Sequence, residues 1–219
     1  MKLFKNIKKW LENQEHLFYL FLLILIVPNI ILCFTEPMPV VAKVCNVLLP
    51  FAFYYLLMTL SRNCGKMFWI LFLFIFFGAF QIVLLYLFGQ SIIAVDMFLN
   101  LVTTNSSEAM ELLDNLVPAL VSVIILYIPA LILAAISIIK KRKLSSEFIR
   151  RERKKAWIAL LIGFISLGAA YGLDKRYELK SDLYPANVCY NVALAFQRNV
   201  QTRTYHRTSE NFTFNAQPS

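Results

Sequence analysis

The sequence predicts an all-α polytopic membrane protein with five transmembrane helices and further amphipathic helices on the outer side of the membrane. Three observations lead to this fold class. The chain is 59% hydrophobic and only 16% charged, with a mean hydropathy of +0.62. Its apolar residues form five runs near the length of about 20 residues that a helix needs to cross the hydrocarbon core. Its cations gather between these runs.

The five predicted spans cover residues 17–34, 40–60, 67–88, 117–139 and 157–173. They assign residues 1–173 to a transmembrane domain, in which residues 89–116 form a long helix-containing loop. Residues 174–219 form a tail. A soluble domain of this size could not bury so much apolar surface, so the bilayer is the expected solvent.

The distribution of cations predicts the orientation of the spans. Four lysines precede the first span, Arg62 and Lys66 lie between the second and third, and nine cations lie between residues 140 and 155. The loop 89–116 has no lysine or arginine. Because cytoplasmic loops carry the excess of cations, the N-terminus is expected in the cytoplasm and the tail outside. The basic loop 140–155 is expected to face anionic lipid headgroups, and no nucleic-acid partner is predicted.

No metal site and no catalytic residue are predicted within these 219 residues. The four cysteines form no CxxC pair, and the two histidines, His16 and His206, are far apart in the sequence. Neither arrangement has the spacing that metal sites show.

Polar side chains in the segment 96–113 form a candidate substrate-binding face. At about 100° per residue, Asn100, Thr104, Glu108 and Glu111 fall within about 80° of one another on a helix. Their amide, hydroxyl and carboxylate groups suit a hydrogen-bonding partner such as a lipid headgroup. An alternative stays open, because Asn105 followed by Glu108 also matches a helix-capping pattern.

The tail is predicted to begin with a second helix outside the membrane. Tyr184-Pro185-Ala186-Asn187 contains a proline start signal, and an apolar-periodic run follows to Gln197. Val188, Val192, Ala195 and Phe196 are expected to form the apolar face of a helix lying on the membrane. The residues after Gln197 are expected to form a linker.

These motifs resemble those of the lipid A phosphoethanolamine transferases, inner-membrane enzymes of Gram-negative bacteria. The family pattern of Asn, Thr and Glu at four-residue spacing matches Asn100, Thr104 and Glu108, and an acidic-leucine run follows at Glu111-Leu112-Leu113. The family's bridging segment is similar to the tail. The matching tail residues are Tyr184-Pro185-Ala186-Asn187, Asn191, Gln201-Thr202-Arg203, Tyr205-His206 and Phe212-Thr213-Phe214.

The resemblance implies the membrane domain of an enzyme that moves phosphoethanolamine from phosphatidylethanolamine to lipid A or another lipopolysaccharide acceptor. It implies a bacterial inner-membrane protein with its C-terminus in the periplasm, where a separate catalytic domain would carry zinc and a threonine nucleophile. Asn100, Thr104 and Glu108 would contact the donor headgroup. Because that catalytic domain is not among these residues, this chain alone is expected to be inactive. The alternative is a non-enzymatic membrane scaffold or a transporter subunit.

The predicted topology can be tested with reporter fusions. Fusions after Glu36, Gly89 and Ser181 should report an external location, and fusions at Gly65 and Ser146 a cytoplasmic one, because the nine cations of residues 140–155 outnumber Lys175, Arg176 and Lys180 on the other side of the last span. Alkaline-phosphatase and fluorescent-protein activities give the two readouts. A cytoplasmic signal from the Ser181 fusion would contradict five crossings.

Overall fold

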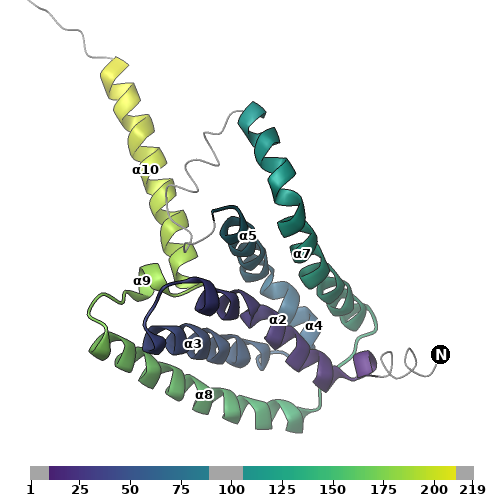
Figure 1. The fold of residues 1–219 in the computed structure, drawn as a ribbon. Coiled ribbons are helices and arrows are strands. Elements are labelled where there is room, and N and C mark those ends of the chain that lie inside the picture. Colours follow the sequence, from purple (N-terminus) through teal and green to yellow (C-terminus); the bar gives the residue numbers. More distant parts are fainter. Residues whose placement is uncertain (1–9, 89–105, 211–219) are drawn as a thin grey trace, which may run out of the picture.

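The computed structural model describes residues 10–88 and 106–210, and all regular secondary structure in this part of the chain is helical (Figure 1). The helices are α2 Gln14–Thr35, α3 Val40–Met58, α4 Cys64–Ile70, α5 Phe72–Phe88, α7 Ser106–Ile139, α8 Ser146–Leu173, α9 Leu179–Asp182 and α10 Ala186–Glu210. Four of them are long and apolar enough to cross a membrane, or five spans if α4 and α5 are counted as one. The predicted all-α class is therefore confirmed for the described residues, with four or five candidate membrane spans. The amphipathic helices outside the membrane stay a prediction.

The third span is not the continuous helix expected over residues 67–88. Helices α4 and α5 meet at Leu71 with a bend of 62°. No proline or glycine marks this position, and both halves pack against α2 and α7. A Cβ atom on Gly65 of α4 would lie 2.3 Å from the carbonyl oxygen of Ala134 in α7. One on Gly78 of α5 would lie 3.0 Å from Pro28 of α2. The bend therefore follows from tertiary packing.

Helix α8 begins earlier than the sequence indicated. A loop through residue 155 was expected, but the helix starts at Ser146. The hydroxyl of Ser145 accepts a hydrogen bond from the backbone N–H of Phe148 at 3.1 Å, and Glu147 lies in the first turn. Both features stabilise a helix N-terminus, the second through the helix dipole. The cations from Arg150 to Lys155 therefore belong to the first turns of α8.

Helices α3 and α8 make the most extensive helix–helix contact in the described part of the chain, and Figure 1 shows them side by side. Small residues bring the two backbones together. Ala156, Gly163 and Ala170 are buried at seven-residue intervals on α8. A Cβ atom on Gly163 would lie 3.1 Å from the Cα atom of Leu49. Close approach of this kind is typical of helices that associate within a membrane.

A buried carboxylate adds a polar tie between the same two helices. The side chain of Glu152 on α8 is 0% exposed and accepts a hydrogen bond from the hydroxyl of Tyr55 on α3. Arg151 and Lys155 form ion pairs with it at 2.8 and 3.0 Å. A buried charge is strongly unfavourable without such partners, so this group places α8 along α3.

The two ends of the bundle differ in character. One end, called the basic end, contains Arg62, Lys66 and residues 140–155. There the side-chain oxygen of Asn63 caps α4, and its side-chain nitrogen donates hydrogen bonds to the carbonyls of Ser137 and Arg142 at 3.2 and 2.8 Å. The opposite end, called here the tail end, holds the α2–α3 turn and the starts of α9 and α10. Figure 1 shows α10 extending away from α2, α3 and α8 there.

Replacing Gly65 by Ala should destabilise the bundle, because the new methyl group would overlap the backbone of Ala134. Overpacking of this kind costs about 1–3 kcal/mol of unfolding free energy. Gly168→Ala is the matched control, since a Cβ atom there meets nothing within 4 Å. Equilibrium unfolding in detergent micelles should show a loss for the first variant only. Equal stability of the two variants would contradict the close α4–α7 contact.

Candidate functional site at the tail end

The structure brings only part of the predicted substrate site into view. Asn100 and Thr104 lie outside the described residues, as does the alternative cap Asn105. Glu108 is described only as part of the first turn of α7. The choice between a headgroup contact and a capping role for Glu108 therefore stays a prediction.

Asn29 joins three segments of the chain at the tail end. Its side chain is 0% exposed, and its amide nitrogen donates to the carbonyls of Asn46 at 2.9 Å and Tyr184 at 2.7 Å. The Asn46 carbonyl needs this donor, because Pro50, four residues on, has no N–H to complete the helical ladder. The side-chain amide of Asn29 in α2 therefore replaces the donor that Pro50 removes from α3. The hydrogen bond from Asn29 to Tyr184 joins both helices to the tail.

Asn46 fixes a second part of the tail. Its amide nitrogen donates to the carbonyl of Asp182 at 2.6 Å, and its side-chain oxygen accepts a hydrogen bond from the Tyr177 hydroxyl at 2.8 Å. Burial, followed by the hydrogen bond to Cys45, raises the pKa of Tyr177, so its hydroxyl remains a donor. Burial also raises the pKa of Tyr184, whose hydroxyl donates to the carbonyl of Phe74 at 2.8 Å. The tail is thus bonded to α2, α3 and α5.

A surface pocket opens where the tail meets the α2–α3 turn. This tail-end pocket has a volume of about 490 Å³ and is lined by Pro37, Met38, Pro39, Ala42, Asp174, Arg176, Tyr177 and Asp182. Asp174 accepts from the backbone N–H of Arg176 at 3.0 Å, which fixes the turn that presents the arginine. A guanidinium suits phosphate oxygens and a carboxylate suits an ammonium group. The pocket therefore offers both charges that a zwitterionic headgroup requires.

A second polar group lies inside the bundle at the same end. A Cβ atom on Gly78 would meet the hydroxyls of Tyr127 at 3.0 Å and Tyr184 at 3.1 Å, so both tyrosines approach one point on α5. Tyr54 of α3 is also fully buried. Gln81 lies one turn beyond Gly78 on α5 and is 1% exposed. Glycine at position 78 is what makes room for the two hydroxyls.

Several of these polar atoms have no protein partner in the part of the chain that the structure describes. They are the hydroxyls of Tyr54 and Tyr127, both polar atoms of the Gln81 amide, the side-chain oxygen of Asn29 and the side-chain nitrogen of Asn187. An unsatisfied buried polar group costs about 1–3 kcal/mol. These donors and acceptors are therefore suited to receiving a polar group from outside the bundle.

The tail differs from the sequence-based expectation in two respects. Helix α10 continues to Glu210, where a linker was expected after Gln197. Val188 is buried against Leu32 and Tyr184, and Val192 is partly buried beside them, whereas Phe196 is 73% exposed. The first turns of α10 thus pack on the bundle. Apolar periodicity located this helix, but it carries no information on which surface covers the apolar side chains.

Neither metal chemistry nor a family is indicated by the remaining observations. Within residues 10–88 and 106–210, no three His, Cys, Asp or Glu side chains are placed to hold a metal ion together. The zinc that the resemblance implies is therefore not assigned to the described residues.

Comparison with protein-family models, curated proteins and solved structures gave no match to this chain.

Asn29→Leu should loosen the tail, because two buried carbonyls lose their donor while the side-chain volume is kept. A loss of about 1.4 kcal/mol corresponds to roughly tenfold more open tail. Limited trypsin digestion reports this as faster cleavage after Lys175, Arg176 and Lys180. Ser122→Ala is the control, since it removes an exposed hydrogen bond to Pro118. If the two variants are cleaved at equal rates, Asn29 does not hold the tail.

Proposed function

We propose that this chain is the membrane part of a phosphoethanolamine transferase that modifies lipid A or lipopolysaccharide. On this proposal it anchors the enzyme in a bacterial inner membrane, with its N-terminus in the cytoplasm. Its tail end faces the periplasm and helps to bind the phosphatidylethanolamine donor. Asn100, Thr104 and Glu108 contact the donor headgroup. Transfer itself takes place on a zinc-dependent catalytic domain of the longer protein.

The observation that carries the proposal is the chemistry of the tail end. Arg176, Asp174 and Asp182 line one pocket there and complement a phosphate and an ammonium group. Helix α5 and helix α7 flank the segment that bears Asn100 and Thr104, and Glu108 lies in the first turn of α7. The tail leaves the bundle at this end through α10. A donor headgroup, the predicted contact residues and the route to a further domain would thus share one side of the protein.

One observation favours the alternative of a transporter subunit. Gln81, Tyr54 and Tyr127 place polar atoms without described partners inside the bundle, and such groups in membrane spans often mark a path for a polar substrate. A transporter needs these groups to be reachable from both ends, whereas a donor site needs access from the tail end alone. Cysteine substitution at Gln81, followed by labelling from each side of the membrane, separates the two functions.

Substituting Glu108 by Gln tests the proposed donor contact. In a chain that includes the catalytic domain, this variant should lose most of its transfer activity while staying folded, since only the charge that faces the ethanolamine ammonium is removed. Mass spectrometry of lipid A measures the transfer.

Asn105→Ala separates the two roles of Glu108. A capping role predicts that Glu108→Gln is nearly normal, because a capping box accepts Glu or Gln, and that Asn105→Ala loses about 1 kcal/mol of stability. A donor contact predicts an inactive but stable Glu108→Gln and a tolerated Asn105→Ala. Full activity of Glu108→Gln would remove this residue from the proposed site.

A further inference from the structure

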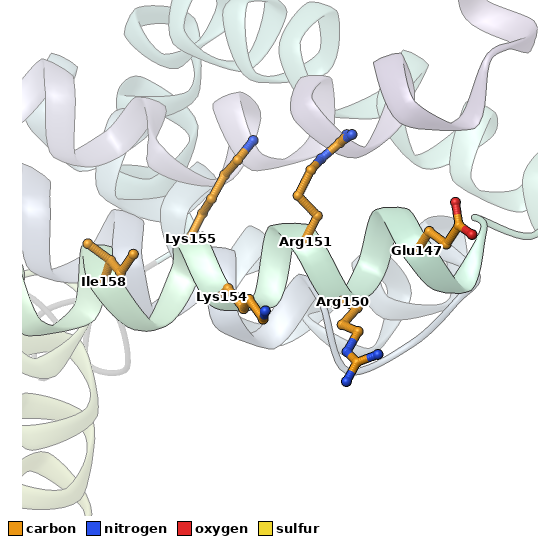
Figure 2. A pocket seen from close by; sticks show the side chains of 6 residues that line it. All are labelled: Glu147, Arg150, Arg151, Lys154, Lys155 and Ile158. Atoms are coloured by element: carbon orange, nitrogen blue, oxygen red, sulfur yellow. The ribbon is translucent and has the colours of Figure 1, made fainter.

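A stripe of cations runs along the first turns of α8 at the basic end. It lines an open surface pocket of about 400 Å³ formed by Glu147, Arg150, Arg151, Lys154, Lys155 and Ile158. Figure 2 shows Arg151 and Lys155 extending to one side of the helix and Arg150 and Lys154 to the other. Each of the six residues has another of the set three or four positions away, so together they form one broad face of α8.

The two pairs of cations have different roles. Arg151 and Lys155 are ion-paired with the buried carboxylate of Glu152, at 2.8 and 3.0 Å. Arg150 and Lys154 are exposed, and neither forms an ion pair within the described residues. Four cations face only two carboxylates, Glu147 and Glu152, so the stripe is positively charged. Arg150 and Lys154 are the groups that remain available to an external anion.

The same face of α8 becomes apolar where the cations end. Ile158, Leu161, Ile162 and Ile165 continue the stripe at the same spacing, and each is between 48% and 63% exposed. Trp157, which is 58% exposed, lies at the change from charged to apolar residues. Tryptophan is enriched at this depth, where a bilayer passes from headgroups to hydrocarbon. Along its axis, α8 thus presents first cations, then an interfacial aromatic ring and then an apolar strip.

We propose that this face binds one anionic glycerophospholipid of the phosphatidylglycerol type. Its phosphate lies between Arg150 and Lys154, and an acyl chain follows Ile158, Leu161 and Ile165. Glu147, at the other end of the pocket, accepts a hydrogen bond from a headgroup hydroxyl. The excess of cations selects a headgroup with a net negative charge over a zwitterionic one. The apolar continuation selects a lipid over a soluble phosphate. This site is independent of the donor site at the tail end.

Native mass spectrometry of the purified chain in detergent tests the site. The chain should retain phosphatidylglycerol in preference to phosphatidylcholine or phosphatidylethanolamine. Each cation near a membrane surface contributes about fivefold in affinity, so R150Q/K154Q should bind phosphatidylglycerol about 30-fold more weakly. K140Q/K143Q is the matched control, because it removes the same charge from exposed positions outside the pocket and should leave the affinity within about twofold of the parent.

Four outcomes would overturn the proposal. Equal losses in the two double variants would mean that only the total charge matters. A preference for phosphatidylethanolamine would mean that the face takes a zwitterionic lipid. Displacement of the lipid by excess glycerol phosphate, or equal affinity for short-chain and long-chain phosphatidylglycerol, would show that the apolar strip takes no part. Thermal unfolding in phosphatidylcholine should be unchanged in both variants, which separates lost binding from lost structure.

Discussion

The arrangement of the tail depends on one buried amide, that of Asn29. Its nitrogen reaches the carbonyl that Pro50 leaves unpaired in α3 and, with its second hydrogen, the carbonyl of Tyr184. Without this group, two buried carbonyls would lie in an apolar bundle without donors, which is a large cost away from water. Asn46 extends the same bonding to Tyr177 and Asp182, so the wall of the tail-end pocket is held by side chains from the first two long helices.

The spans could be predicted from sequence because the bilayer imposes a length on them. An apolar run of about 20 residues has few alternatives to a membrane helix, and each predicted run lies in a helix or in the bent pair α4–α5, except that the run 40–60 extends two residues beyond the end of α3. The bend at Leu71 could not be predicted in this way, since no residue at that position disfavours a helix. Gly65 and Gly78 lie on the two sides of the bend, and both are close to partners that are distant in the sequence, which apolar periodicity does not report.

The candidate site was less accessible to sequence reasoning. Asn100, Thr104 and Glu108 were singled out by their spacing, and their arrangement stays a prediction because the described residues do not include their side chains. The polar group around Gly78 carries no periodic signal. Tyr54, Tyr127 and Tyr184 come from three distant segments. Tyrosine is common in membrane helices, so its presence in the sequence does not indicate a site. Lysine and arginine between residues 140 and 155 were assigned to a loop because charge alone does not distinguish a loop from the polar turns of a helix.

The helices of this bundle differ in the thickness of hydrocarbon that each can match. The apolar part of α7, from Val117 to Ile139, has 23 residues and is about 35 Å long, whereas the apolar part of α8, from Trp157 to Leu173, is only about 26 Å long. Since most of the apolar side chains of both helices are exposed, lipids beside α8 would meet a shorter hydrophobic surface than lipids beside α7. The bilayer would then be thinner beside α8 than on the other side of the protein. Such an asymmetry favours locations in thinner regions of the membrane, or beside other proteins with short hydrophobic surfaces.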